Sequence, residues 1–292
     1  MGFIKIAIPS VVAVCLISGC NKNDKTADIS EAGQQVGDIM ASIDEAGGNA
    51  DGAISFREIE SAKKTFARLG VPDPRLTVAQ FLIPEAQAVQ CSASSFSACA
   101  NGIRSKSLGS CTIGRATFAG DITLTFSDSS CSMAANGATV SRVPDFTVTG
   151  RRGGTLTVEK TGSYGQKITK GASSFTFESD GIRRSFNIAG QTRFDFTTAT
   201  TSAITVTGIN RSDRTIDGGQ LLITNNSTSA SCTISPSNIT YTSNCNCATS
   251  GTWSGSCSDG NSFSLEISGC GSASLTIGAE SESFTFDRCY SI

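Results

Sequence analysis

Apolar and polar residues alternate along most of the chain after residue 110. In short segments, Phe, Ile, Leu or Val occupies every second position, with Thr, Ser or a charged residue in between. A period of two residues predicts β-strands, and the Gly, Asn, Asp or Ser between segments predicts hairpin turns. The segments with this pattern are 121–126, 145–149, 174–178, 193–197, 203–207, 220–224, 262–267, 273–277 and 283–287.

Strands of this kind need cover on only one face, which is typical of antiparallel sheets. We therefore predict a mainly β domain over residues 91–292, built as an antiparallel up-and-down meander that closes into a barrel or folds into a sandwich. The pattern does not choose between these two. Outer-membrane barrels alternate in the same way, but the strands here carry few apolar positions and no evident aromatic girdle.

Before residue 90 the apolar period is that of a helix. Residues 29–90 are therefore expected to form a small helical region with two amphipathic helices, the second ending before Pro72. Residues 21–90 carry eleven acidic and seven basic side chains, a net charge of −4, whereas residues 91–292 carry +1. The two apolar stripes are Val36, Ile39, Met40 and Ile43, and Phe56, Ile59, Ala62, Phe66 and Leu69.

Residues 47–58, between the two helical stripes, resemble the twelve-residue calcium loop of EF-hand proteins. The resemblance implies a weak, structural Ca²⁺ site with a dissociation constant on the order of 10⁻⁴ to 10⁻³ M. Its first position is Gly47, where the family nearly always has Asp. The same residues also fit a helix N-terminal capping box without metal, so both interpretations stay open. The implied ligands are Asn49, Asp51, the Ala53 carbonyl, Ser55 and Glu58.

The first twenty residues resemble the export signal of bacterial lipoproteins. Lys5 precedes an apolar run that is too short to span a bilayer, and the run ends in Ile17-Ser-Gly-Cys20. This resemblance implies that residues 1–19 are removed, that Cys20 carries covalent lipid, and that residues 20–28 form a lipidated tether. The acyl chains would then be the contact with the membrane. Asn21, rather than Asp, favours the cell outer membrane, and the face remains undetermined.

Ten cysteines remain besides Cys15 and Cys20, and an even number in an exported chain predicts disulfides. Short-loop spacing suggests three pairs, Cys111–Cys131, Cys247–Cys257 and Cys270–Cys289. The chain has no histidine, which removes His-based triads and most zinc sites, and its net charge of −2 gives no affinity for nucleic acid. The disulfide candidates are Cys91, Cys99, Cys111, Cys131, Cys232, Cys245, Cys247, Cys257, Cys270 and Cys289.

Taken together, these features predict a non-enzymatic, membrane-anchored lipoprotein of the bacterial cell envelope with a structural or binding role, such as adhesion. An envelope protein or a glycan would be its partner. The alternatives are an envelope hydrolase acting through Asp or Glu carboxylates, and a lipid or lipoprotein carrier that uses the apolar inner face of the sheet. We expect Trp253 to pack inside the domain, and the arginine pairs at 151–152 and 183–184 to be solvated surface.

Overall fold

The computed structural model describes residues 96–292, apart from 110, 114–115, 151–152, 209–210, 246, 287–288, 290 and 292. Upstream it describes only Gly33 and Val36, two isolated helical positions, which do not test the helical region predicted for residues 29–90. The signal, the tether and the calcium-like loop lie outside the described residues.

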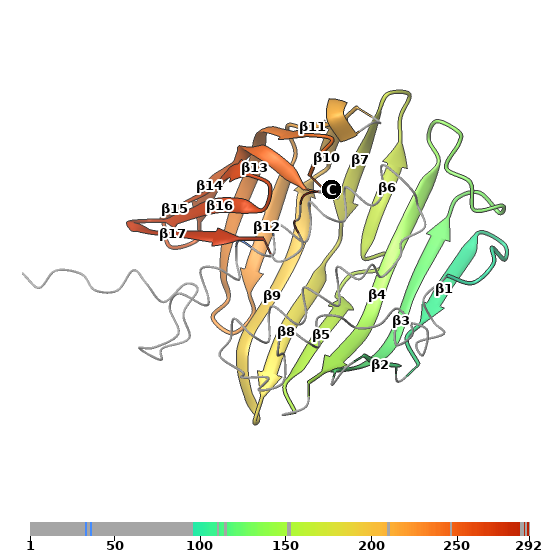
Figure 1. The fold of residues 1–292 in the computed structure, drawn as a ribbon, viewed down its shortest axis with the longest axis horizontal. Coiled ribbons are helices and arrows are strands. Elements are labelled where there is room, and N and C mark those ends of the chain that lie inside the picture. The colour runs from blue at the N-terminus through green and yellow to red at the C-terminus, as the bar shows by residue number, and fades with distance from the viewer. Residues whose placement is uncertain are drawn as a thin grey trace, which may run out of the picture.

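Seventeen strands build one antiparallel sheet in the described part of the chain (Figure 1). A single turn of 3-10 helix, η2 (Arg211–Asp213), precedes β11. The strands are β1 (Ile103–Ser107), β2 (Cys111–Ile113), β3 (Ala116–Phe126), β4 (Thr139–Thr149), β5 (Thr155–Lys160), β6 (Gln166–Lys170), β7 (Ser174–Ser179), β8 (Ile182–Ile188), β9 (Gln191–Ser202), β10 (Ile204–Thr207), β11 (Thr215–Ile216), β12 (Gln220–Asn225), β13 (Ala230–Tyr241), β14 (Ala248–Cys257), β15 (Ser262–Gly269), β16 (Ser272–Ile277) and β17 (Glu280–Thr285).

Several long strands in the middle of the sheet are interrupted by a short break, so that two consecutive strands pair with one continuous neighbour. β4 pairs with both β5 and β6, and β13 pairs with both β11 and β12. Between them, one path of pairings runs through β5, β8, β9 and β12, and the other through β6, β7, β10 and β11. The chain thus meanders up and down across the sheet, which confirms the predicted antiparallel, mainly β class.

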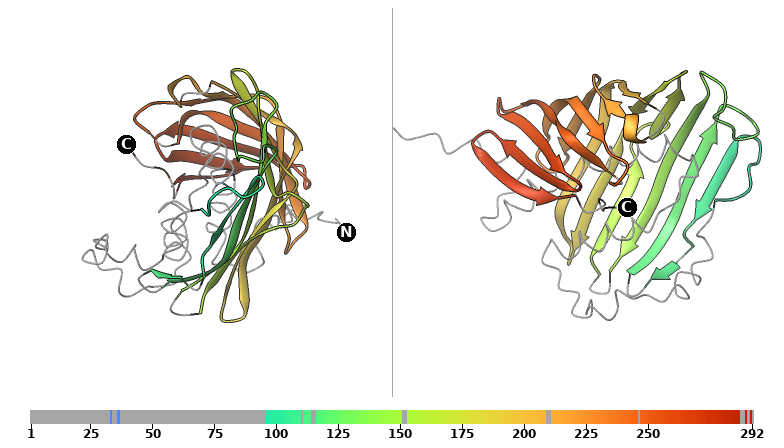
Figure 2. Two further views of the ribbon diagram at one scale, coloured as in Figure 1. Left: turned by 90° about the vertical axis from the view of Figure 1, so that its right-hand side faces the viewer. Right: turned by 45° about the horizontal axis from the view of Figure 1, so that its top comes forward.

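The sheet is strongly curved, and β13 to β17 bend over toward its concave side (Figure 2). Among the described strands, β17 pairs only with β16, while β1 and β2 pair only with β3. No described pairing therefore joins the two ends of the meander. Right-handed twist, which accumulates from strand to strand, accounts for curling in a sheet this wide.

One face of the sheet is apolar and buried. Directly paired residues share a face, so the row Phe118, Val148, Leu156, Phe186 and Phe194 marks the inner side from β3 to β9. The rings of Phe186 and Phe194 stack with centroids 6.0 Å apart. On the other face, rows such as Thr117, Thr149 and Thr155 carry hydroxyls. The alternation seen in the sequence therefore separates a hydrophobic core from a polar outer face.

Glycines flanking Trp253 set how closely β13 and β14 approach. Gly251 has a φ of +113°, and a Cβ there would meet the backbone of Asn238 and Ile239. A Cβ on Gly255 would overlap the carbonyl oxygen of Thr233. Neither position therefore accepts a larger residue without moving β13.

Candidate functional site

A polar network that spans three strands is centred on Arg183 of β8, on the outer face. Its guanidinium donates to both carboxylate oxygens of Asp195 on β9, with Nε–Oδ1 2.8 Å and Nη2–Oδ2 2.6 Å. Its Nη1 donates to Glu159 Oε1 on β5 at 2.9 Å. The Asn226 amide donates to Asp195 Oδ1 at 2.7 Å and to Thr197 Oγ1 at 2.9 Å.

Strand register brings these residues together. Glu159 on β5 lies directly opposite Arg183 on β8. Asp195 on β9 lies opposite Ser185, which follows Arg183 by two residues in β8. Arg183 therefore reaches one carboxylate on each neighbouring strand, and a planar guanidinium can hold the nearer one with two parallel hydrogen bonds. The network joins β5, β8 and β9, and through Asn226 it extends to the turn after β12.

The Asp195 side chain is only 11% exposed. Burial alone would raise its pKa, but hydrogen bonds from Arg183 and Asn226, together with the Arg183 charge, outweigh burial and hold the pKa of Asp195 below its ordinary value. The hydrogen bond with Asp195 is the main cause that raises the pKa of Arg183. A carboxylate held ionised in this way is poorly suited to donate a proton, so the network's chemistry is that of a structural ion pair.

Replacing Asp195 with Asn should destabilise the protein at neutral pH by about 1–3 kcal/mol, because a partly buried guanidinium loses its best partner. The pH dependence should also change. Since the folded-state pKa of Asp195 is lowered, its stabilisation is complete above the unfolded value of about 3.9 and is lost as pH falls through the folded value. Urea unfolding between pH 7 and pH 3 should therefore show a shallower acid loss in Asp195→Asn than in the wild type.

Asp145 offers a matched control on the same face. It lies between Asp121 and Glu159 on adjacent strands, and like charges directly opposite one another destabilise a sheet. Asp145→Asn should therefore leave stability at pH 7 unchanged or slightly raised. An equal loss in both variants would mean that the Arg183 network contributes no specific stabilisation.

A second carboxylate motif was not predicted from the sequence. Asp180, between β7 and β8, accepts hydrogen bonds from the backbone N–H groups of Ser163, Tyr164 and Gly165 and from the Ser163 hydroxyl. Burial opposes ionisation here as well, but these donors lower the pKa of Asp180. The motif fixes the turn that interrupts the strand between β5 and β6. Its only sequence signal is the Gly-Ser-Tyr-Gly run at 162–165.

Four disulfides confirm that the domain is cross-linked, but all three predicted pairings are wrong. The spacing argument assumed that each bridge closes a short hairpin loop, whereas the observed bridges join residues 25 to 42 positions apart. The bridges are Cys99–Cys131, Cys232–Cys257, Cys245–Cys270 and Cys247–Cys289. Cys91 and the side chain of Cys111 lie outside the described part.

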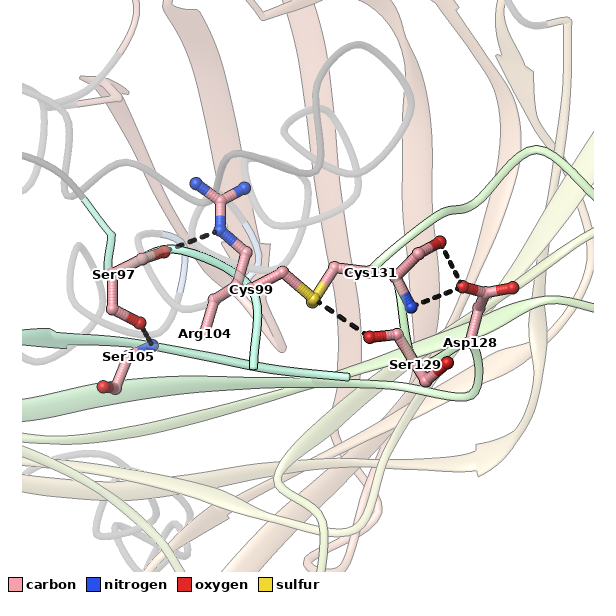
Figure 3. Close-up of a disulfide and its surroundings, with 8 residues drawn as sticks. Ser97, Cys99, Arg104, Ser105, Asp128, Ser129 and Cys131 are labelled. Carbon is pink, nitrogen blue, oxygen red and sulfur yellow. Dashed lines mark hydrogen bonds between the residues drawn. A yellow bond between two sulfur atoms is a disulfide. The ribbon is translucent and has the colours of Figure 1, made fainter. Parts of the chain in front are cut away.

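The Cys99–Cys131 bridge ties the segment before β1 to the β3–β4 connection (Figure 3). The Cys99 sulfur lies 3.3 Å from the Ser129 carbonyl oxygen, which is a contact and not a hydrogen bond because a disulfide sulfur carries no proton. Beside the bridge, Arg104 Nε donates to the Ser97 carbonyl and the Ser105 N–H donates to the Ser97 hydroxyl. Residues 96–100 are thereby held along the outer edge of β1.

The other predicted sites have different outcomes. Cys20 and the implied calcium ligands lie outside the described residues, and no group of three or more Asp, Glu, Cys or His within the described ranges is placed to hold a metal ion.

Trp253 is fully buried, as expected for packing. The prediction that the pair at 183–184 is solvated surface is wrong for Arg184, which points to the inner face and is 4% exposed.

No helix in the part of the chain that the structure describes is long and apolar enough to cross a membrane. The described side chains include the ion-pair network of Arg183, the turn fixed by Asp180 and four disulfides. No family model, curated protein or solved structure matches this chain.

Proposed function

We propose that this protein is a non-enzymatic, membrane-anchored lipoprotein of the bacterial cell envelope, with a structural or binding role. The observation that carries the proposal is the set of four disulfides in the β domain. Disulfides persist in oxidising compartments and are rare in the cytosol. They agree with the export signal predicted at residues 1–20, whose last four residues, Ile17-Ser-Gly-Cys20, form the lipobox motif, and with acylation of Cys20.

The polar outer face supports a body that stands in water and binds through its surface. One cross-strand row from β13 to β17 consists of hydroxyl residues alone, Ser235, Ser254, Ser264, Thr276 and Ser281. A lipid-facing strand surface would instead carry an apolar band. An envelope protein or a glycan is the kind of partner that a hydroxyl-rich face can hydrogen-bond. The Glu159–Arg183–Asp195 geometry gives no support to the alternative of an envelope hydrolase.

The test of the anchor is metabolic labelling with radioactive palmitate in a double-membraned bacterium that expresses the full chain. We expect label on the wild-type protein and its recovery with the outer-membrane fraction, and no label on Cys20→Ser. Cys15→Ser serves as the control and should label normally, because the cleaved segment contains it. Equal labelling of Cys20→Ser and the wild type would refute the lipobox.

The structural Ca²⁺ at residues 47–58 remains part of this proposal. Calorimetric titration of the full chain with calcium should show one weak site that Glu58→Gln abolishes, because a bidentate Glu closes such loops. Absence of binding would leave Ser55 and Glu58 as a helix cap.

A second candidate, a lipid or lipoprotein carrier, is favoured by one observation. The curved sheet has an apolar concave face, which is buried in this structure and would line a trough for acyl chains once it opened. Binding of a fluorescent fatty acid by the full chain, saturable and competed by unlabelled fatty acid, would support this candidate over a purely structural role.

A further inference from the structure

One of the four disulfides differs from the other three in its exposure to water. Cys99 is exposed and its partner Cys131 is half-buried, whereas each of the other bridges has at least one buried cysteine. The buried ones are Cys232, Cys257, Cys245 and Cys247, each 7% exposed or less. Reduction begins when an external thiolate reaches a disulfide sulfur. The Cys99–Cys131 bridge is therefore the one that a reductant reaches without opening the sheet.

This bridge fastens a short segment, residues 96–100, along the outer edge of β1. The Ser97 N–H donates to the Ser105 carbonyl oxygen at 2.8 Å. The Ser105 N–H donates to the Ser97 hydroxyl at 3.0 Å, and Arg104 Nε donates to the Ser97 carbonyl oxygen at 3.2 Å (Figure 3). Of the five residues, only Phe96 is buried. A segment with so few buried side chains can open locally while the sheet stays folded.

The segment covers the backbone of an edge strand. Among the described strands β1 pairs with β3 alone, and the N–H and C=O of Ser105 point to its other side, where Ser97 pairs with both. An edge strand with free N–H and C=O groups is a template for pairing with another chain, and natural proteins cover such edges. Residues 96–100 thus act as a cover for this edge, and the disulfide is its covalent fastening.

The other half of the bridge lies in a backbone conformation that the surrounding structure must hold. Cys131 has a φ of +60°, in the left-handed region that residues with a Cβ rarely adopt. Its N–H donates to the Asp128 carbonyl oxygen at 2.9 Å within the β3–β4 connection. A conformation of this kind persists only while its constraints remain. Opening of the bridge removes one of these constraints, so the connection as well as the segment can then move.

We propose that the Cys99–Cys131 bridge is a redox latch on the edge of β1. A dithiol reductant attacks the exposed Cys99 sulfur through one thiolate, the S–S bond breaks, and Cys131 leaves as a thiolate. The second thiol of the reductant then displaces Cys99 from the mixed disulfide. The dithiol gives up two electrons and two protons and ends as a disulfide, and both cysteines end as thiols. Residues 96–100 then detach, which uncovers the backbone of β1. This inference does not depend on the lipid anchor.

Partial reduction of the folded full chain tests the order in which the bridges open. The protein is treated with dithiothreitol in the absence of denaturant and quenched with iodoacetamide, and peptide mapping follows the cysteines of the four bridges. We expect Cys99 and Cys131 to be alkylated about tenfold faster or more than the other six, because only their bridge is reached without local unfolding. Reduction of any other bridge earlier than, or together with, Cys99–Cys131 would overturn the proposal.

Amide hydrogen exchange, followed by NMR, tests whether the bridge holds the cover. After partial reduction, the Ser105 N–H should exchange about tenfold faster or more, because its acceptor on Ser97 leaves. Amides of β8 and β9, in the middle of the sheet, are the internal control and should keep their protection. Cys99→Ser/Cys131→Ser should exchange like the reduced protein, with or without dithiothreitol. Unchanged protection of Ser105 after reduction would overturn the latch, and so would a loss of protection in β8 and β9.

Discussion

Removal of the Cys245–Cys270 and Cys247–Cys289 bridges, with alanine at all four positions, should lower the thermal midpoint by about 10–20 °C. The bridges join residues 25 and 42 positions apart, and loops of this size correspond to about 3–4 kcal/mol each. In a domain of this size, each kcal/mol shifts the midpoint by about 2–4 °C. The two loops overlap, so the combined loss should be less than additive.

The position of these two bridges in the fold is the second reason why their removal should lower the thermal midpoint strongly. Cys245 and Cys247 lie in the β13–β14 connection, Cys270 in the β15–β16 turn and Cys289 beyond β17. The two bridges therefore fasten two connections and the segment after β17 to one another, and hold the last strand to the rest. Without them, β15 to β17 keep only the contacts of a short meander at the edge of the sheet.

The Cys99–Cys131 bridge is the control. Cys99 is exposed, and the bridge holds a short segment along β1. Its replacement by alanine should lower the midpoint by much less, since the segment can detach while the sheet remains folded. Differential scanning calorimetry compares the thermal midpoints of the wild type, the variant without the Cys245–Cys270 and Cys247–Cys289 bridges, and the variant without the Cys99–Cys131 bridge. Equal losses from both replacements would show that position in the sheet has no influence on the effect of a bridge.

The strands with strict alternation could be predicted from sequence because their inward residues are large and apolar. The predicted segment 121–126 lies in β3, 174–178 in β7 and 193–197 in β9. Strands whose inward positions hold other residue types gave no such signal. β13 turns Ala230, Cys232 and Pro236 inward among its buried residues, and β14 has Gly251 and Gly255 beside its tryptophan.

The ion-pair network was missed for a related reason. β8 was not predicted as a strand, because Arg184 and Ser185 interrupt its apolar pattern. Without that strand, Arg183 and Arg184 read as one exposed basic pair. In a strand, neighbouring residues point to opposite faces, so one arginine joins Asp195 outside and the other is buried inside. Which side chains cross to neighbouring strands depends on register, which short-range patterns do not determine.

The disulfide pairing failed because the nearest cysteine in sequence was not the nearest in space. Cys232 and Cys257 are direct cross-strand partners at the far ends of the long β13–β14 hairpin. Cys247 lies ten residues before Cys257 at the other end of the same strand. An extended strand of that length separates its ends by about 30 Å, which excludes the predicted Cys247–Cys257 bridge once β14 is recognised.

Replacement of Trp253 by alanine should cost about 3–5 kcal/mol, the range for removing a large aromatic side chain from a packed core. Trp253 is fully buried, with Pro236 and Leu265 as its cross-strand partners, and the close approach of β13 at Gly255 leaves little freedom for collapse into the cavity. Trp253→Phe keeps most of the volume and should lose much less. As the chain has one tryptophan, the wild-type emission itself checks the premise: a short-wavelength maximum that shifts to the red on unfolding is expected. A native maximum like that of free tryptophan, or a small loss in Trp253→Ala, would instead favour an exposed ring available for stacking on a ligand.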